Sequence, residues 1–423
     1  MNSFVVELDN NYLFNSYNYD LLKYDSVIKK EKYFDEVGLE DIFIESECTR
    51  KTENLLKVVL NMSNDCNLKC KYCYASHGTY GRKENIMSLQ TMNNIISDLK
   101  NRGIKHINLV SFFGGEPLIN IELIKLGLKL FNKNFKVNKY EITTNATLVN
   151  KDMLKIFKNY NVLLNMSLDG PRDINDYLRG IGTYEKILKT ISMAKEIDYN
   201  NLAISCTFTK KHIDFGYSLE ELKSYLNEFD IKYNISPVIT DIKDLQLVRR
   251  EETEDNNNNL KINKEIKDSI EAILKKQKNY FINPYVHDIL YPLINNTKSY
   301  TFCDELYTNL SLNYDYNGDI YNCFRFWGNK EFICSNEKLT VDAIREINIK
   351  DNHFECKECW SRFFCGVCIA DIMKENLSMP YYNGGCKRRD IYKEIMNEIV
   401  NIIDEDPENF ELLINNFPEY NFY

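Results

Sequence analysis

Three cysteines in a CxxxCxxC spacing stand close together in the chain: Cys66, Cys70 and Cys73. One loop with this spacing can wrap three corners of a cubane iron-sulfur cluster and leave the fourth iron open for chemistry. A structural cluster takes four thiolates, and zinc usually takes two CxxC pairs or adds histidine. The loop therefore predicts a cluster whose fourth iron meets a substrate or cofactor, with a zinc site or a redox dithiol as the alternative.

The cysteine loop follows an apolar run at 56–62 that is typical of a β-strand. This order places the loop at a strand's carboxyl end, where α/β barrels keep their active sites. In spacing, and in Tyr72 before the last cysteine, the loop resembles that of the radical SAM enzymes. The resemblance implies that S-adenosylmethionine chelates the open iron and is cleaved to a 5′-deoxyadenosyl radical.

A second motif supports this resemblance. The next apolar run, 106–113, ends in Gly114, Gly115, Glu116 and Pro117. The glycines allow close backbone approach, and a carboxylate can hold an ammonium. The stretch resembles the family's GGE motif, which grips the methionyl amino group, although the same residues alone would also make an ordinary turn.

Short apolar segments alternate with amphipathic segments from 56 to 240, which is the signature of a parallel βα sheet or barrel. Six strands are expected, at 56–62, 106–113, 139–144, 162–168, 202–208 and 232–236. Helices are expected near 88–101, 120–133, 150–159, 183–196 and 217–228. Six units are too few for a closed barrel, and the family resembled has an open, partial (βα)6 TIM-like barrel.

Further polar residues follow the predicted strands where S-adenosylmethionine would lie. They are Asn145, Ser167, Asp169 and Arg179. In the family resembled, matching positions after the fourth strand bind the ribose hydroxyls, and an arginine beyond it often meets the methionyl carboxylate. The alternative is that Asp169 belongs to a turn and that Arg179 is a surface charge.

A second group of cysteines lies near the C-terminus. Its members are Cys303, Cys323, Cys356, Cys359, Cys365, Cys368 and Cys386. The CxxC pairs at 356–359 and 365–368 could form a zinc ribbon. The whole pattern, with Gly318 ahead of Cys323, resembles the SPASM extension, which holds two auxiliary 4Fe-4S clusters, although the last pair is one residue shorter than usual.

The resemblance implies an interleaved ligation of these two clusters. Cys356, Cys359, Cys365 and Cys386 would complete one, while Cys303, Cys323 and Cys368 would hold the other, which is one ligand short. An open iron there could bind a substrate thiolate. Cys48, Cys206 and Cys334 are then bystanders, with Cys334 close enough in sequence to be the missing ligand.

The composition limits the function classes. The 423 residues allow two or three domains, and a net charge of −9 argues against a general nucleic-acid binder. The 13 cysteines cluster at metal-ligand spacings, and no secretory leader pattern opens the chain, so a reducing cytoplasm is expected. No apolar run approaches the roughly 18 residues of a membrane-spanning helix.

The expected division has five parts. They are an N-terminal segment (1–55), the barrel (56–240), a connector (241–300), a SPASM domain (301–390), and a C-terminal helix and tail (391–423). The connector is expected to hold a polar loop at 251–259 and helices, one of them at 261–278. Alternating segments at 4–8 and 12–17 suggest a small sheet packed on the barrel. It could capture a leader peptide by strand addition, or serve packing alone.

The resemblance to radical SAM/SPASM peptide maturases implies an activity. The chain most resembles the members of this family that join a cysteine sulfur to a carbon of another residue in a ribosomally made peptide. Three 4Fe-4S clusters, S-adenosylmethionine, a cysteine-containing precursor peptide and an electron donor such as flavodoxin or ferredoxin are expected. The alternatives are an anaerobic sulfatase-maturing enzyme that makes formylglycine, a maturase that makes carbon-carbon links or epimerised residues, and a zinc-dependent interaction protein.

Overall fold

The computed structural model describes residues 4–24, 53–238, 240, 242–245, 256–277, 282–303, 311–334, 349–366, 369 and 387–420. The chain forms two compact units. One contains residues 47–252 and 308–342, and the other contains residues 1–46, 253–307 and 343–423.

An eight-stranded sheet runs through the unit of residues 47–252 and 308–342, in the order β11-β10-β4-β5-β6-β7-β8-β9. The strands β4 to β9 are parallel to their neighbours, which confirms the six predicted strands. Their bounds are β4 Asn54–Ser63, β5 His106–Gly114, β6 Lys136–Thr144, β7 Val162–Ser167, β8 Leu202–Phe208 and β9 Lys232–Pro237.

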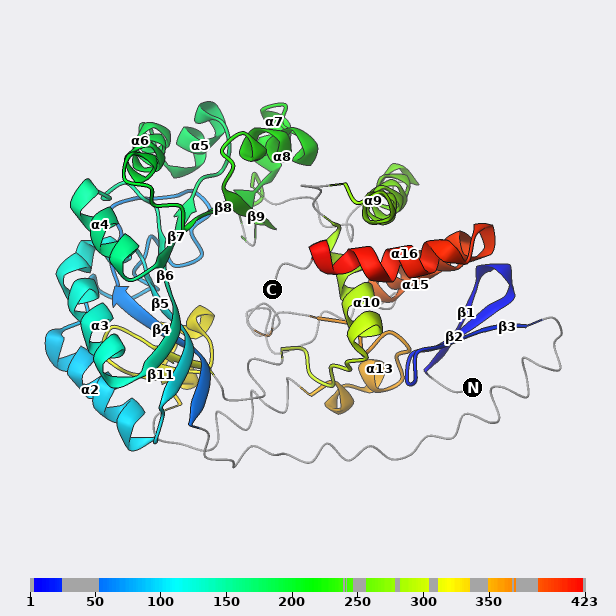
Figure 1. Ribbon diagram of the computed structural model, residues 1–423, viewed down its shortest axis with the longest axis horizontal. Helices are drawn as coiled ribbons and strands as arrows, with labels where there is room; N and C mark the ends of the chain where they lie inside the picture. The colour runs from blue at the N-terminus through cyan, green and yellow to red at the C-terminus, as the bar shows by residue number, and fades with distance from the viewer. Residues whose placement is uncertain are drawn as a thin grey trace. The chain divides into compact units, whose positions relative to one another are not determined.

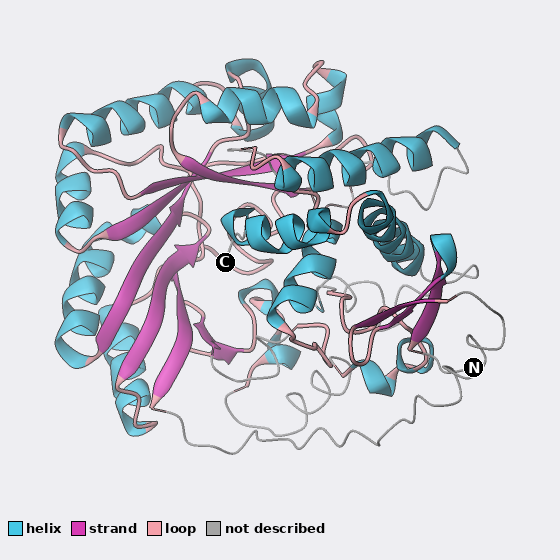
Figure 2. Ribbon diagram, turned by 45° about the vertical axis from the view of Figure 1, so that its right-hand side comes forward, coloured by secondary structure: helices cyan, strands magenta, loops and turns pink. Residues whose placement is uncertain are grey.

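Helices alternate with these strands and cover one face of the sheet (Figures 1 and 2). Apolar side chains of alternate strand positions, such as Leu164, and of the helices, such as Phe157, make a common buried core. The helices are α2 Leu89–Asn101, α3 Ile121–Asn134, α4 Lys151–Asn159, α5 Arg172–Arg179, α6 Thr183–Glu196, α7 Lys210–Asp214 and α8 Leu219–Asn227.

Two strands of this sheet were not predicted. Strand β10 (Ser311–Tyr314) pairs in parallel with β4, and β11 (Ile320–Tyr321) pairs antiparallel with β10. Both are short, and β10 finds its partner far earlier in the chain, so local patterning carries little signal for them. The stretch 301–390 therefore contributes to both units.

The described residues of the other unit form a three-stranded antiparallel sheet and four longer helices. Its strands are β1 Val5–Leu8, β2 Tyr12–Asn15 and β3 Asp20–Lys23. Its helices are α9 Asn256–Leu274, α10 Pro284–Asn295, α15 Lys387–Glu405 and α16 Glu408–Asn416, with a short α13 at Phe354–Lys357.

The N-terminal sheet was expected to pack on the barrel. In the structure, Phe14 of β2 shares a buried core with helices of its own unit, including Ile270 of α9 and Ile395 of α15. Helix α9 begins at Asn256, inside the polar run that was predicted to be a loop, and α10 is a second helix within the predicted connector. None of the helices in the described part of the chain combines the length and apolarity needed to cross a membrane.

Candidate active site

The cysteine loop leaves the end of β4 and is tied to the neighbouring strand ends. Cys66 N–H donates to the Asp65 carboxylate at 2.7 Å, and Leu68 N–H donates to Cys66 Sγ at 3.4 Å. After β6, the Asn145 amide donates to Asn67 Oδ1 at 2.9 Å and to Cys66 Sγ at 3.8 Å. The loop conformation is thus fixed by its own backbone amides and by Asn145 after β6, and two of these donors point to a predicted ligand sulfur.

The two glycines after β5 lie directly against the cysteine loop. Gly115 N–H donates to the Ser63 carbonyl, and Glu116 N–H donates to the Asp65 carbonyl, each at 2.8 Å. A Cβ on Gly115 would lie 2.3 Å from the Asp65 carbonyl oxygen, and one on Gly78 would lie 2.7 Å from Cys66 Cβ. Only glycine permits this approach, so the two motifs are in direct contact.

Glu116 is fully buried at the carboxyl edge of the sheet. Its carboxylate accepts hydrogen bonds from Thr144 Oγ1 at 2.7 Å, from Asn145 N–H at 2.8 Å and from Leu118 N–H at 3.0 Å. Burial raises the pKa of Glu116 to about 6, against the lowering effect of these three donors. The carboxylate therefore joins the ends of β5 and β6 and keeps its charge at neutral pH.

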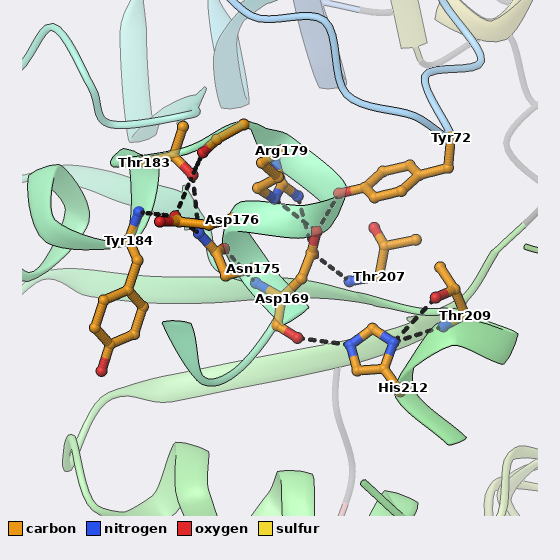
Figure 3. A network of polar contacts seen from close by, with 11 residues as sticks. Tyr72, Asp169, Asn175, Asp176, Arg179, Thr183, Tyr184, Thr207, Thr209 and His212 are labelled. Atoms are coloured by element: carbon orange, nitrogen blue, oxygen red, sulfur yellow. Dashed lines mark hydrogen bonds and ion pairs between the residues drawn. The ribbon is translucent and has the colours of Figure 1, made fainter. Parts of the chain in front are cut away.

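Asp169, directly after β7, is the centre of a second polar network (Figure 3). Its carboxylate accepts from Arg179 Nε at 2.8 Å, from Tyr72 Oη at 2.5 Å and from Thr207 N–H at 2.9 Å. Asp169 and Arg179 are both buried. The structure thus brings three of the predicted cofactor residues, Tyr72, Asp169 and Arg179, into direct contact, and Arg179 is not a surface charge.

Neighbouring residues hold Asp169 from its backbone. Asp169 N–H donates to Asn175 Oδ1 at 3.1 Å, and His212 Nε2 donates to the Asp169 carbonyl at 2.6 Å. His212 Nδ1 accepts from Thr209 N–H at 3.0 Å, which leaves the proton on Nε2. Burial lowers the pKa of His212. Ser167, another predicted residue, ends β7 and pairs in register with Ser205 of β8.

The three thiols fit the predicted cluster by their chemistry. All three are partly exposed on one loop. Burial raises the pKa of the Cys66 thiol to about 12 and also raises that of Cys70, so a bound metal must supply the positive charge that deprotonates them. In the part of the chain that the structure describes, no three His, Cys, Asp or Glu side chains meet around one metal ion. A cubane, in contrast, takes each thiolate on a different iron.

The second group of cysteines is divided between the two units. Cys303, Cys356, Cys359 and Cys365 belong to the unit that holds the N-terminal sheet, whereas Cys323 follows β11. Cys368 and Cys386, together with Cys48, lie outside the described residues. Cys334 donates its thiol hydrogen to Asn322 Oδ1 at 3.0 Å. Cys206 is buried in β8, where burial raises its pKa.

An aromatic cluster that sequence reasoning missed connects the Cys323 segment to the first cysteine loop. Tyr80 packs on Trp327 with ring centroids 5.5 Å apart, and Phe113 of β5 packs on Phe324 at 5.1 Å. Tyr74, next to Cys73, packs on Tyr80 at 6.2 Å. The aromatic residues flanking Cys73 and Cys323 were the available signal, but only the β10 pairing brings them together.

Comparisons with known proteins agree with this geometry. Residues 60–247 match the sequence model of the Radical SAM superfamily. The chain is 31% identical over 179 residues to a cysteine-type anaerobic sulfatase-maturating enzyme of Clostridium novyi, covering 39% of this chain and 47% of that protein. It spans about half the length of the curated relatives that it matches.

Two solved structures share the fold at low identity. One is anSMEcpe with bound AdoMet, with a TM-score of 0.60 and 20% identity over 85% of this chain and 98% of that chain. The other is SuiB of Streptococcus suis bound to precursor peptide SuiA, with a TM-score of 0.53 and 19% identity over 88% of this chain and 95% of that chain. Residues 60–247 thus match the radical SAM family model, and the chain shares the fold of these two structures.

Proposed function

We propose that this chain is a radical SAM peptide maturase that joins a cysteine sulfur to a carbon of another residue in a ribosomally made peptide. The observation that carries the proposal is the contact between the cysteine loop and the glycine pair, where Gly115 meets Asp65 with no room for a side chain. Likeness to a protein named for sulfatase maturation, and to a structure that contains a bound precursor peptide, supports the substrate class.

In this proposal, Cys66, Cys70 and Cys73 hold one 4Fe-4S cluster, and S-adenosylmethionine lies across the strand ends. Bound there, the cluster and S-adenosylmethionine supply a 5′-deoxyadenosyl radical. Gly114 and Gly115 let the backbone approach the methionyl group, and Glu116 presents a charged carboxylate to its ammonium. This segment lies close to Cys66, because Glu116 N–H donates to the carbonyl of Asp65, the residue before Cys66.

The remaining predicted residues orient the other end of the cofactor. Arg179 is proposed to meet the methionyl carboxylate, with its guanidinium held by Asp169. Asn145 and Ser167 are proposed to lie along the ribose side. The Asp169 carboxylate already accepts four hydrogen bonds, so we assign it to the positioning of Tyr72 and Arg179 as well as to ribose contact.

Two auxiliary clusters complete the proposal, one on Cys356, Cys359, Cys365 and Cys386 and one on Cys303, Cys323 and Cys368. Forming a thioether replaces a C–H and an S–H bond by a C–S bond. The deoxyadenosyl radical would take the carbon's hydrogen atom, the thiol proton would leave to solvent, and one electron would pass to the auxiliary cluster. A substrate thiolate at the incompletely ligated auxiliary site would be placed for this step. Flavodoxin or ferredoxin is the proposed electron donor, in a cytoplasmic setting.

Formylglycine formation, as in sulfatase maturation, is the second candidate, and the likeness to the Clostridium novyi protein favours it. The thioether and formylglycine products differ in elemental composition. A thioether product keeps its sulfur and loses two hydrogens, whereas conversion of cysteine to formylglycine expels the sulfur. Mass spectrometry of a cysteine-containing peptide after reaction therefore separates these two candidates. A carbon-carbon link leaves the thiols free for alkylation.

Metal content tests the radical SAM assignment. After anaerobic reconstitution the protein should hold about twelve irons, four per cubane. Changing Cys66, Cys70 and Cys73 together to alanine should remove about four irons and abolish cleavage of S-adenosylmethionine. Stoichiometric zinc with little iron, or cleavage that survives in the triple variant, would overturn the proposal.

Cys334→Ala tests whether the second auxiliary site lacks a protein ligand. Cys334 directly follows Ile333, the bridge partner of Tyr321 in β11, and its thiol donates to Asn322, the neighbour of Cys323. If Cys334 is a bystander, the variant keeps its iron and its cluster spectrum. A loss of iron in the absence of peptide would show that Cys334 is the fourth ligand and that no vacant iron awaits a substrate thiolate.

A further inference from the structure

The face of the large sheet that points away from the helices carries a row of polar side chains. On β6, Tyr140 and Ile142 belong to the buried core between sheet and helices. Because side chains alternate along a strand, Glu141 lies on the opposite face. Glu141 is partly exposed, so this charged group is accessible from the open side of the barrel.

Residues of three adjacent strands surround the Glu141 carboxylate. Ser111 of β5 is its register partner and donates to Oε2 at 3.4 Å. Asn165 of β7 donates to Oε1 at 3.4 Å, and Ser205 of β8 donates to Asn165 Oδ1 at 2.9 Å. Ser205 thereby occupies the acceptor end of the Asn165 amide and directs its donor end toward Glu141.

These contacts leave about half of the carboxylate's acceptor positions unused. Both donors to Glu141 are at the long limit of a hydrogen bond, and two carboxylate oxygens offer about four acceptor positions. Over the described residues, no lysine or arginine forms an ion pair with Glu141. Lys57 and Lys139 lie nearer the amino ends of their strands on this side, and Lys57 Nζ lies over the Phe324 ring at 5.8 Å.

The position of Glu141 relates it to the reaction centre. It stands three residues before Thr144, which hydrogen-bonds Glu116 at the cofactor edge of the sheet. Three residues of a strand span about 10 Å. A lysine or arginine side chain has a long flexible stem with its charge at the end. Such a side chain could enter from the strand ends, where the reacting residue lies, and direct its charge toward Glu141.

We propose that Glu141, oriented by Ser111, Asn165 and Ser205, binds the ammonium or guanidinium of a basic side chain in the substrate peptide. This inference rests on the proposed function, because it assumes that the peptide enters the open side of the barrel. It adds a sequence preference, namely a lysine or arginine near the modified residue.

Small probes test the site directly. N-acetyl-lysinamide, N-acetyl-argininamide and the uncharged N-acetyl-norleucinamide are titrated into the reconstituted protein and followed by ligand-detected NMR. At least one cationic probe should bind more tightly than norleucinamide. Glu141→Gln should weaken that binding about tenfold or more, because it removes a charge-assisted contact. The preferred probe identifies the side chain as lysine or arginine.

Further variants make the test specific. Glu141→Asp keeps the charge but withdraws it by one methylene, and Ser205→Ala frees the Asn165 amide, so each should weaken cation binding less than Glu141→Gln. The matched control is Glu122→Gln on α3, whose side chain is 82% exposed on the helix-covered side. It should leave the affinity unchanged, and circular dichroism confirms that each variant is folded.

Two outcomes overturn the inference without touching the proposed function. In one, the unaltered protein binds the three probes equally while it cleaves S-adenosylmethionine. In the other, Glu141→Gln binds the cations as tightly as Glu122→Gln. If the unaltered protein neither holds iron nor cleaves S-adenosylmethionine, the proposed function fails, and with it the assignment of the cation to a substrate peptide.

Discussion

Arg179 Nε lies 2.8 Å from Asp169 Oδ2, and Arg179 Nη2 lies 3.1 Å from Asp169 Oδ1. The two-point contact fixes the plane of the guanidinium. The Asp169 side chain is fully buried and that of Arg179 is 8% exposed. This pair connects α5 to the end of β7, and through Tyr72 it reaches the cysteine loop.

Removing the charge of Asp169 should destabilise this unit strongly. Asp169→Asn leaves the buried guanidinium of Arg179 without a counter-charge, which typically costs about 3–5 kcal/mol. The midpoint of thermal or urea unfolding measures the loss. Glu122→Gln, which breaks an exposed pair with Lys125 on α3, should change stability by less than about 0.5 kcal/mol. Equal effects of the two substitutions would show that the Asp169–Arg179 pair is not a stabilising contact.

Gly115→Ala should displace the cysteine loop. The new methyl carbon would lie 2.3 Å from the Asp65 carbonyl oxygen, and both groups belong to backbone that must move. We expect the variant to lose about four irons after reconstitution. Gly103→Ala is the control. Its φ of +79° also brings strain of about 1 kcal/mol, but the new methyl group would meet no atom within 4 Å. Full iron retention in Gly115→Ala would contradict the close contact.

Glu116 should give the stability a measurable pH dependence. Burial raises its pKa from 4.5 to about 6, so between these values the folded protein binds a proton that the unfolded chain does not. The folded form therefore gains stability as pH falls from above 6 toward 4.5, by about 2 kcal/mol at most for this group. Glu116→Gln removes this gain.

The measurement is the difference in unfolding midpoint between Glu116→Gln and the unaltered protein, taken without S-adenosylmethionine. The difference should favour the variant more at pH 7.5 than at pH 5. A difference that is the same at both pH values would mean that Glu116 titrates alike in the folded and unfolded chain.

His212 should act in the opposite direction. Burial lowers its pKa below the usual 6.5, so the unfolded chain binds a proton before the folded one does. Its stabilising contribution is complete above 6.5 and is lost as pH falls below that value. His212→Gln should reduce this loss of stability at low pH. The unfolding midpoints of the variant and the unaltered protein, measured between pH 7.5 and 5.5, test the prediction. Parallel pH profiles of the two proteins would remove His212 as the cause.

Much of the barrel could be predicted from the sequence because its elements are locally encoded. Continuous apolar runs separated by amphipathic helices predict parallel strands, and all six appear, from β4 to β9. The CxxxCxxC loop and the glycine pair were identified by residue type and by their position after strands, which also places them at one edge of the sheet.

Tertiary structure alone decided which distant residues meet. Strand β10 depends on its register with β4, and the cluster of Tyr80, Trp327 and Phe324 depends in turn on β10. The sequence marks Asp169 and Arg179 as polar, but only the packing of α5 against β7 turns them into a buried pair. Likewise, the alternation of side chains puts Glu141 on one face of β6. Only strand pairing brings the donors Ser111 and Asn165 to its carboxylate, and Ser205 to Asn165. Local sequence sets which elements form, whereas long-range pairing sets the partners of each charge.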